Sequence, residues 1–526
     1  MEILENQCSV TMAYGQQCRQ RAIWGSSKCI LHEPDPAKDP IEFDSVVAEI
    51  LREPIVDLRG DLMCDFTRVV FPSRLHSSMA LEISNGASLN FNDAIFSQGV
   101  DFDGAVFVSD VDFSEATFMK TALFRGAAFE QQAYFAGANF REASSFVETK
   151  FGKWASFGKV TFGASADFAE ARFGAPVHFR GSRFMEEASF DDAVFEMGAF
   201  FGGAIFKWLG SFRGTVFAKM ADFSCATVEY VFRLYPNNCS LMKLNGMRID
   251  YLVDIAMAGK FALEVADLRG NGRLSIRGSR SKRVANFASS LNFNCLRFDG
   301  KIYLENVDLT RSTFQRADLS CLRLSGVRWL ERNGRQMVLL EETILRLVMP
   351  DLREIEHQYR GFKEIYKVHG NHWMAGWANY GELEMRLRRS LLEQRMRSAR
   401  WRFLQRLSLA WRRLAAWEWW YKISSRFGMS FWRPIVFGLV PLTFFGLVGS
   451  LVIAFLNQEA PMDFVQAFLV RYGYDVFFLR PPQEIDGPDL KGVTDWVYKF
   501  CALGAKVGLG VLLSMAVLAV RRRFKT

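Results

Sequence analysis

Three cysteines and one histidine near the start of the chain have the residue types that bind a metal ion. Cys8, Cys18, Cys29 and His32 lie within 25 residues, in a segment too short to form a hydrophobic core of its own. Thiolates and imidazoles are the ligands of closed tetrahedral zinc sites, and Cys29-x2-His32 presents two of them from one turn. The pattern predicts a structural zinc module over residues 1–40. The alternative is a set of unligated thiols in a reducing compartment.

A strict phenylalanine repeat, from Phe91 to Phe223, determines the architecture that must support this module. Twenty-five phenylalanines of this stretch are alternately 5 and 6 residues apart, and from Phe96 onward a small residue (Ala, Val, Ser, Thr or Gly) precedes each of them by two positions. Such spacing would put phenylalanine on two stripes of a helix and on both faces of a strand. A coil with short straight faces fits better, because each face can turn one large and one small side chain inward.

The repeated unit, as in Ala105-Val106-Phe107 and Ala116-Thr117-Phe118, resembles the pentapeptide-repeat family in its variant with one extra residue on alternate faces. The resemblance implies a mainly β fold, the right-handed quadrilateral β-helix with four faces per coil. At 22 residues per coil, the 24 faces from Phe96 to Phe223 correspond to about six coils. The phenylalanine column is then core and not a ligand-binding site. The segment around Cys29 and His32 also resembles a short N-terminal module of some members of this family.

The regions on either side of the regular repeat are less clearly patterned. Residues 41–90 are expected to form a helix from Phe43 to Leu51 and then the first coils, through Phe66 and Phe71. Residues 224–330 are expected to continue the solenoid irregularly, and the faces between 230 and 285 cannot be assigned. His178 matches no ligand pattern and is expected to be an ordinary surface residue.

The charge is unevenly distributed, although the net value is +8. Residues 91–223 hold 17 acidic and 12 basic side chains, and this acidic excess is too small for a mimic of duplex DNA. Nucleic-acid binding is not expected either, because the repeat has no stripe of basic residues. Residues 386–433 hold 13 basic and 2 acidic side chains interleaved with tryptophan, which favours a helix on anionic lipid.

Residues 331–433 are therefore predicted to be a basic, aromatic, α-helical stalk, whose first helix ends before Pro350. They resemble the segment that joins the repeats to the membrane in bacterial membrane-bound pentapeptide-repeat proteins. The remaining residues, 434–526, contain two apolar stretches of membrane-spanning length, 435–456 and 496–520. Basic residues precede the first stretch and follow the second, and the loop between the two stretches is acidic. Both termini and the solenoid are therefore expected on the cytosolic side of a bacterial inner membrane.

The second stretch contains an intramembrane candidate site. Lys506 lies within it, and Gly504-x3-Gly508 would allow close helix packing. Two spans with a loop between them resemble the pore domain of some membrane pentapeptide-repeat proteins, but the potassium filter signature Thr-x-Gly-Tyr-Gly is absent.

Two functions follow from these observations. The first is a membrane-anchored cytosolic scaffold or regulator that binds a protein partner through its solenoid. The alternative is an oligomeric two-helix pore gated by the solenoid, with Lys506 facing the lumen. Because no nucleophile–base pair, phosphate loop or paired carboxylates stand out, we do not expect an enzyme.

Overall fold

The computed structural model describes residues 7–12, 15–23, 26–34, 38–56, 62–72, 75–76, 86–257, 262–278, 290–344 and 349–397. They belong to two compact units. The solenoid unit comprises the described residues up to Leu330 together with Leu339–Glu341, and the helical unit comprises Glu331–Val338 and those from Glu342 onward.

The predicted membrane domain, residues 434–526, lies outside the described residues. The stretches 435–456 and 496–520, with Gly504, Lys506 and Gly508, lie outside the described residues, as does the stalk beyond Arg397. Among the helices of the described ranges, none is both long and apolar enough to cross a membrane.

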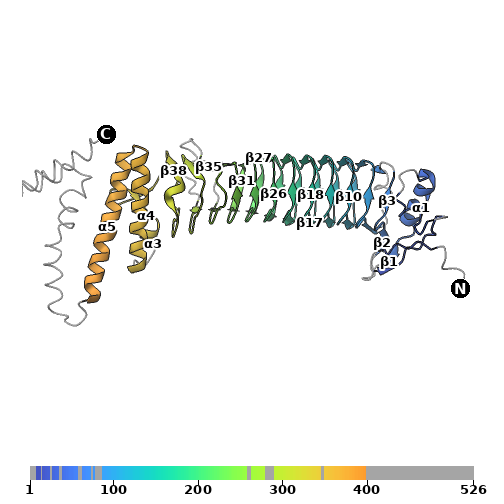
Figure 1. Cartoon of the computed structure of the whole chain (residues 1–526), viewed down its shortest axis with the longest axis horizontal. Coiled ribbons are helices and arrows are strands. Elements are labelled where there is room, and N and C mark those ends of the chain that lie inside the picture. The colour runs from blue at the N-terminus through green and yellow to red at the C-terminus, as the bar shows by residue number, and fades with distance from the viewer. Residues whose placement is uncertain are drawn as a thin grey trace, which may run out of the picture. The chain divides into compact units, whose positions relative to one another are not determined.

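The solenoid is built from 22-residue coils, each with four short strands. One coil contains β6 (Ile95–Phe96), β7 (Val100–Asp101), β8 (Val106–Phe107) and β9 (Val111–Asp112). The next strand, β10 (Thr117–Phe118), pairs in parallel with β6 and sets Phe118 beside Phe96. Figure 1 shows the strands stacked along the solenoid, which makes about 11 turns. The predicted mainly β, right-handed solenoid is therefore confirmed.

The stacked strands form three sheets in this unit, which are parallel except for the antiparallel pair of β1 (Ile55–Val56) and β2 (Leu62–Asp65). The nine-stranded sheet contains β3 (Val70–Phe71), β6, β10, β14 (Asn139–Phe140), β18 (Thr161–Phe162), β22 (Arg183–Phe184), β26 (Ile205–Phe206), β29 (Thr227–Val228) and β32 (Arg248–Ile249). The twelve-stranded sheet contains β4 (Leu75–His76), β7, β11 (Ala122–Leu123), β15 (Ser144–Ser145), β19 (Ala166–Asp167), β23 (Ala188–Ser189), β27 (Leu209–Arg213), β30 (Val231–Tyr235), β33 (Leu252–Met257), β35 (Arg273–Gly278), β37 (Lys301–Glu305) and β38 (Leu322–Ser325).

The third sheet has seventeen strands and covers the other two faces. In the regular repeat it contains β5 (Ser88–Asn90), β8, β9, β12 (Ala128–Phe129), β13 (Ala133–Tyr134), β16 (Lys150–Phe151), β17 (Ala155–Ser156), β20 (Arg172–Phe173), β21 (Val177–His178), β24 (Val194–Phe195), β25 (Ala199–Phe200) and β28 (Val216–Asp222). Its ends are β1 (Ile55–Val56) and β2 (Leu62–Asp65) on one side and β31 (Asn238–Lys243), β34 (Ala262–Glu264) and β36 (Ser290–Asn292) on the other.

The phenylalanines fill the interior, as the repeat predicts. The 25 phenylalanines of the regular spacing from Phe91 to Phe223 are at most 4% exposed, whereas Phe200, which lies outside that spacing, is only partly buried. Rings one coil apart stack face to face: the centroids of Phe118 and Phe140 are 4.4 Å apart, with ring planes 1° from parallel. The small residue before each phenylalanine leaves room for these rings. At Gly210, a Cβ atom would lie 2.4 Å from the Phe232 ring, so even alanine does not fit there without a shift.

One corner of each repeat has a left-handed backbone. A positive φ recurs every 11 residues from Asp93 through Gly104 and Glu115 to Cys225. Glycine adopts this conformation without steric cost, whereas a side chain costs about 1–2 kcal/mol. The chain nevertheless places acidic residues at several of these corners, including Glu170 with a φ of 58°.

Beyond Phe223 the coils continue without the strict phenylalanine spacing. Val231 pairs with Leu252 and Leu252 pairs with Arg273, so each of these coils has 21 residues instead of 22. Arg273 then pairs with Lys301, 28 residues on, across a segment that includes residues outside the described ranges. The strands that we could not assign from sequence are thus regular solenoid strands. Leucine, isoleucine, valine and methionine replace phenylalanine inside them, for example Ile255 and Met242.

Helix α1 (Pro40–Arg52) lies before the first coils and includes the helix predicted from Phe43 to Leu51. Asp39 caps it, because its carboxylate accepts a hydrogen bond from the backbone N–H of Ile41. Phe43 is buried and packs edge-on against Phe71, with centroids 5.6 Å apart. The helix therefore adds its apolar face to the phenylalanine column.

The helical unit begins with a β-hairpin, which corrects the prediction that residues 331–433 are helical from their start. Strands β39 (Leu330–Arg332) and β40 (Arg335–Val338) pair across Asn333-Gly334, both with positive φ, as in a type I′ turn. Helix α3 spans Glu341–Ile344, residues 345–348 lie outside the described ranges, and Pro350 lies in the first turn of α4 (Met349–Val368). Proline is well tolerated in a first turn because its missing N–H would be unpaired there.

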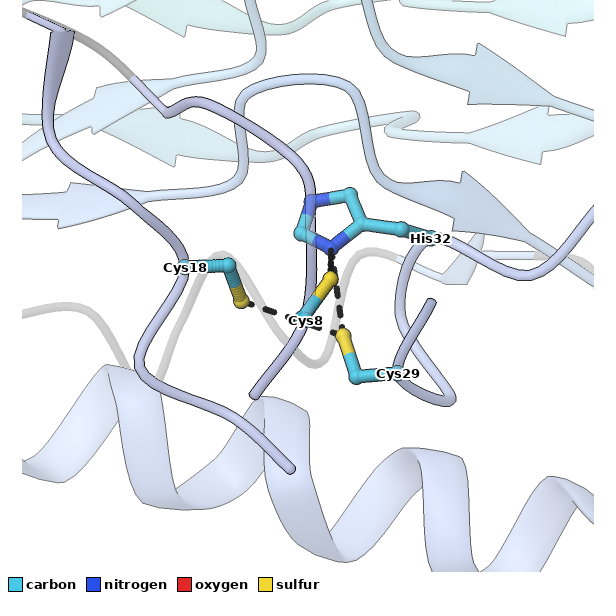
Figure 2. A group of neighbouring side chains, drawn as sticks. All are labelled: Cys8, Cys18, Cys29 and His32. Atoms are coloured by element: carbon cyan, nitrogen blue, oxygen red, sulfur yellow. Dashed lines mark hydrogen bonds between the residues drawn. The ribbon is translucent and has the colours of Figure 1, made fainter. Parts of the chain in front are cut away.

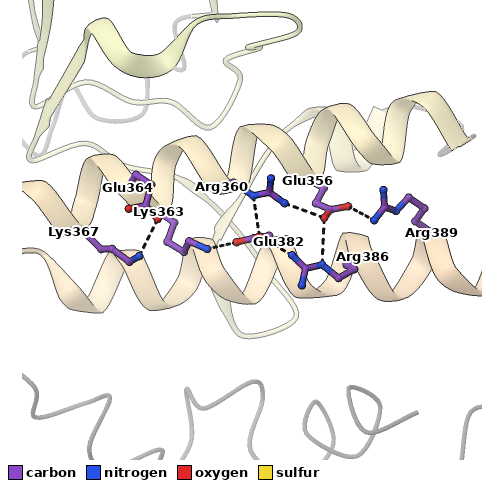
Figure 3. A network of polar contacts seen from close by, with 8 residues as sticks. All are labelled: Glu356, Arg360, Lys363, Glu364, Lys367, Glu382, Arg386 and Arg389. Carbon is purple, nitrogen blue, oxygen red and sulfur yellow. Dashed lines mark hydrogen bonds and ion pairs between the residues drawn. The ribbon is translucent and has the colours of Figure 1, made fainter. Parts of the chain in front are cut away.

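Helix α5 (His372–Arg397) follows α4 after a short turn at Gly370, and the two helices lie side by side (Figure 1). Two buried carboxylates link them (Figure 3). Glu356 of α4 is paired with Arg386 at 3.3 Å and Arg389 at 3.2 Å of α5. Glu382 of α5 is paired with Arg360 of α4 at 3.2 Å and with Lys363. Helices α4 and α5 are therefore held together by interhelical salt bridges as well as by apolar packing.

Candidate metal centre and exposed aromatic surface

The structure brings together the four side chains that we selected as ligands. Cys8, Cys18, Cys29 and His32 are all buried, and their ligand atoms lie within 4.8 Å of one another (Figure 2). The Sγ atom of Cys8 is 3.5 Å from Nδ1 of His32, and the Sγ atoms of Cys18 and Cys29 are 3.8 Å apart. A tetrahedral zinc ion with bonds of about 2.0–2.3 Å requires ligand atoms about 3.5–3.8 Å apart. The arrangement fits such an ion.

Local backbone structure explains how a short segment positions these ligands. Cys8 and Cys18 lie on two antiparallel segments, joined by backbone hydrogen bonds from Cys8 N to Gln20 O and from Cys18 N to Val10 O. Cys29 and His32 share one turn, in which the N–H of His32 donates to the carbonyl of Cys29 at 3.1 Å. Two ligands from a hairpin-like pair and two from a turn can therefore converge without a large core.

The imidazole of His32 is oriented by the first coil of the solenoid. Its Nε2 lies 3.1 Å from the backbone carbonyl oxygen of Thr67. A carbonyl can only accept, so Nε2 carries the proton and Nδ1 turns its lone pair toward the sulfur atoms. Thr67 is itself fixed, because its hydroxyl donates to Asp65 at 2.6 Å and accepts from the amide of Asn90 at 3.0 Å. Sequence reasoning could not find this support, since a backbone carbonyl has no residue signature.

The thiols cannot easily ionise together. The hydrogen bond from Cys18 lowers the pKa of Cys29 to about 4, and the same contact, with burial, raises the pKa of Cys18. Burial also raises the pKa of Cys8. One thiolate therefore forms readily while the other two resist ionisation, because like charges would be held a few ångströms apart away from water. A bound cation would remove this conflict, which favours a metal site over unligated thiols.

A row of exposed aromatic rings lies on the outer surface of the solenoid. Trp208, Tyr230 and Tyr251 precede β27, β30 and β33, with exposed fractions of 57, 39 and 54%. The Trp208 and Tyr230 centroids are 4.5 Å apart and those of Tyr230 and Tyr251 are 4.9 Å apart, with ring planes within 16° of parallel. We call these three residues the aromatic row. Because the rings cover one another's faces, the row presents mainly its edges, and no base or sugar ring can insert between its members.

Basic side chains extend from the strands beside the aromatic row. Arg213, Arg233, Arg273 and Arg277 are on β27, β30 and β35, while Asp254 of β33 lies among them. Arg277 pairs with Asp254, whose Oδ1 lies 3.1 Å from its Nε, and its Nη2 donates to the hydroxyl of Tyr235 at 3.1 Å. We call these four arginines the arginine patch. The surface thus combines exposed apolar rings with positive charge.

A second set of rings involves His178, which we had expected to be an ordinary surface residue. It is half-buried, stacks on Phe200 at 4.6 Å between centroids, and contacts Trp154 at the same distance. Burial, aided by the charge of Arg180, lowers the pKa of His178. His178 thus packs between two aromatic rings on the outside of the coil. The sequence signal for this stacking was the 22-residue spacing of positions 178 and 200, which places the two residues side by side on adjacent coils.

Comparison with known proteins identifies the repeat. The family model described as Pentapeptide repeats (9 copies) matches residues 86–128 and 124–172. The predicted pentapeptide repeats are therefore confirmed in this part of the solenoid. Searches of curated proteins and of solved structures found no match.

Proposed function

We propose that the chain is a membrane-anchored scaffold or regulator, which uses the outer surface of its solenoid to bind a protein partner. A pentapeptide-repeat solenoid supports a role in protein interaction in general. Its interior is filled by stacked phenylalanine rings, which makes it a rigid support and leaves recognition to side chains on its surface.

The aromatic row is the observation that carries this proposal. Trp208, Tyr230 and Tyr251 are large aromatic residues held in place by stacking, so burying them against a partner costs little side-chain entropy. Their stacked faces exclude base or sugar intercalation, while their edges fit aliphatic side chains. The arginine patch beside them favours acidic groups. The partner that fits this surface is a protein segment with exposed apolar and acidic side chains.

Removing the aromatic row tests this assignment. The full chain, tagged and extracted from its native membrane, is compared with Trp208→Ser/Tyr230→Ser/Tyr251→Ser and with Arg233→Glu/Arg273→Glu. A matched control removes exposed apolar residues elsewhere on the solenoid, Ile95→Ser/Val106→Ser/Val108→Ser. We expect one protein to be retained in stoichiometric amount by the wild type and the control, and lost from both surface variants. Retention of that protein by the aromatic variant would show that binding uses another surface.

We further propose that the module at Cys8, Cys18, Cys29 and His32 holds a structural zinc ion. Three thiolates and one imidazole are a common zinc ligand set, and the closed, buried cluster suits a structural ion. The ion would tie the N-terminal segments to the first coil through His32 and Thr67. A repeat solenoid needs such a cap, because its end strand otherwise presents unpaired backbone groups.

Membrane anchorage through 435–456 and 496–520 rests on the sequence, and so does a cytosolic solenoid in a bacterial inner membrane. The pore alternative rests on Lys506, Gly504 and Gly508 of the second stretch. Ion flux through liposomes that hold the full chain separates the two, with Lys506→Ala and Lys506→Glu as variants. Flux whose selectivity changes with Lys506 would establish the pore. For a scaffold we expect no flux. A scaffold also does not need to form the homo-oligomer that a pore requires.

A further inference from the structure

The outer side of the twelve-stranded sheet carries opposite charges on the two sides of the aromatic row. The strand registers from β23 to β37 join six positions into one column along the solenoid, namely Glu187, Leu209, Val231, Leu252, Arg273 and Lys301. Trp208, Tyr230 and Tyr251 directly precede three members of this column. The order along the face is therefore acidic, aromatic and basic.

The two coils before the aromatic row are acidic on this side of the solenoid. Residues 164–170 and 186–192 contain no basic side chain and six carboxylates, which belong to Asp167, Glu170, Glu186, Glu187, Asp191 and Asp192. The coils after the row are basic. Residues 272–277, 300–305 and 320–325 contain one carboxylate, Glu305, and four basic side chains, which belong to Arg273, Arg277, Lys301 and Arg323. The face is therefore strongly polarised along the solenoid.

This charge distribution is unfavourable for a solenoid without a partner. Like charges that lie opposite each other on paired strands repel, and Arg273 of β35 is paired directly with Lys301 of β37. The side chains of Glu186, Glu187, Arg273 and Lys301 are exposed, and none of the four is in an ion pair with another described residue. A partner with the opposite order of charge would neutralise both ends of the face at once.

A second copy of the chain presents that opposite order when it runs antiparallel. Tyr230 is the middle ring of the row, and the coils of Glu187 and Arg273 lie two coils before and two coils after it. A two-fold axis at Tyr230 brings Glu187 of each copy opposite Arg273 of the other. Trp208 then faces Tyr251, so aromatic rings occupy the centre of the interface. The two charged positions are about 19 Å apart at the spacing of paired strands, so each copy can make both ionic contacts.

We propose that the aromatic row and the charged coils beside it form the interface of an antiparallel homodimer, in which the acidic coils of each copy bind the basic coils of the other. This inference rests on the proposed binding role of the aromatic row and identifies the partner as a second copy of this chain. It explains why apolar rings, acidic groups and basic groups share one side of the solenoid. Because the same surface serves both copies, the contact is closed at two chains.

Capture of one of two differently tagged, co-expressed full-length chains tests the dimer. The wild type should recover the second copy from detergent extracts of its membrane. We expect recovery to fall at least about tenfold when both copies carry Glu186→Lys/Glu187→Lys. The same loss is expected when both carry Arg273→Glu/Lys301→Glu. In each case like charges are set opposite each other at both ends of the interface.

Mixing the two variants is the decisive measurement. One copy with Glu186→Lys/Glu187→Lys and one with Arg273→Glu/Lys301→Glu should be recovered together as well as two wild-type copies, because opposite charges meet again at both ends. Recovery of the mixed pair also shows that both variants are folded. If mixing does not restore recovery, the acidic and basic coils do not face each other and the antiparallel arrangement is wrong.

The matched control reverses two exposed charges that directly follow β12 and β24 of the seventeen-stranded sheet, Glu130→Lys/Glu196→Lys, and should leave recovery unchanged. Equal recovery in every variant would place self-association elsewhere in the chain and would refute this inference. Failure to recover a second copy, with stoichiometric capture of another protein that depends on the aromatic row, would refute the dimer and leave the proposed binding role intact. If nothing that is captured depends on the aromatic row, that role is wrong as well.

Discussion

The Nε2 atom of His32 donates a hydrogen bond to the backbone carbonyl of Thr67, across 35 residues of sequence, at 3.1 Å. This contact joins the cysteine–histidine cluster to the first coil of the solenoid. The backbone N–H of Val70, in β3, also donates to the carbonyl of Leu31 in the same metal-binding turn at 2.9 Å. The cluster is therefore part of the end of the solenoid, and its metal content should affect the stability of that end.

The first prediction concerns metal content. Cys29→Ser/His32→Ala removes two of the four ligands, so the purified chain should lose its single zinc ion. Metal analysis of the reduced, dialysed protein measures the zinc per chain. Cys225→Ser, which replaces an exposed cysteine outside the cluster, is the control and should keep the metal. Equal zinc in both variants would refute the ligand assignment.

The second prediction concerns where the metal stabilises the fold. Removal of zinc by a chelator should increase amide hydrogen exchange in residues 62–72, which hold Thr67 and Val70, because their partners in the module are lost. Residues 140–200 should be unaffected, since each coil contacts only its neighbours. Mass spectrometry of exchanged peptides reports both regions at once. Loss of protection throughout the solenoid would contradict a local cap.

The third prediction tests the phenylalanine core. Phe146→Ala leaves a cavity between the stacked rings of Phe124 and Phe168, whose centroids lie 4.8 and 4.7 Å from that of Phe146. We expect the free energy of unfolding to fall by about 3–5 kcal/mol. The control Val106→Ala, at an exposed position, should change it by less than about 0.5 kcal/mol. Denaturant titration, followed by circular dichroism, compares the two. Similar effects would mean that the rings are not the principal core.

The fourth prediction tests the left-handed corners. Glu170 has a φ of 58° and lies between Glu148 and Asp192, one coil to each side. Glu170→Gly should raise the free energy of unfolding by about 0.5–1 kcal/mol, because it relieves backbone strain and like-charge repulsion. The reverse change, Gly203→Ala, should lower it by about 1 kcal/mol, since the φ there is 69° and a Cβ meets no atom within 4 Å. Thermal unfolding of both variants tests the pair, and shifts of the same sign would disprove the strain.

The fifth prediction concerns acid and the helix pair. Burial opposes ionisation of Glu382, but hydrogen bonds from Lys363 and Arg360 prevail and lower its pKa. A carboxyl whose pKa is lower in the folded state than in the unfolded state stabilises the fold at pH values above its unfolded-state pKa. This stabilisation is lost as the pH falls through its folded-state pKa. The helix pair should therefore weaken below about pH 4.

Glu382→Gln isolates this effect. At pH 7 it should cost about 1–3 kcal/mol, because the cations lose a charged partner. It should also reduce the dependence of helix unfolding on pH between about 3 and 5, as measured by ellipticity at 222 nm. Glu364→Gln alters an exposed pair with Lys367 and serves as the control. An unchanged pH profile in Glu382→Gln would show that other carboxylates govern acid unfolding.

The regular solenoid could be predicted because phenylalanine spacing maps directly onto geometry. A 22-residue coil places Phe118 beside Phe140, and only small residues fit between the rings. The continuation of the solenoid over residues 224–330 was predicted, but the strands between 230 and 285 could not be assigned, since their core residues are common in any fold and their period changes to 21. The left-handed corners were also hidden, because Asp, Gly, Glu, Lys and Cys all occupy them.

The ligands of the metal centre were visible in the sequence because thiols and imidazole are distinctive, but their supports were not. Thr67 acts through its backbone carbonyl, so it has no motif. The hairpin at Asn333-Gly334 was different. Its dipeptide is a strong turn signal, and we missed it because we interpreted the loss of glycine after residue 330 as the start of helices.

The 22-residue coil also has a mechanical consequence. Each coil is bound only to the coil on either side, so tension along the solenoid would detach coils singly from an end. A released coil of 22 residues extends to about 75 Å of chain. Force–extension curves would then show evenly spaced steps for the 22-residue coils, slightly shorter steps for the 21-residue coils beyond Val231, and a longer step for the 28-residue coil from Arg273 to Lys301. A solenoid held at one end and pulled from the other would lengthen coil by coil instead of failing all at once.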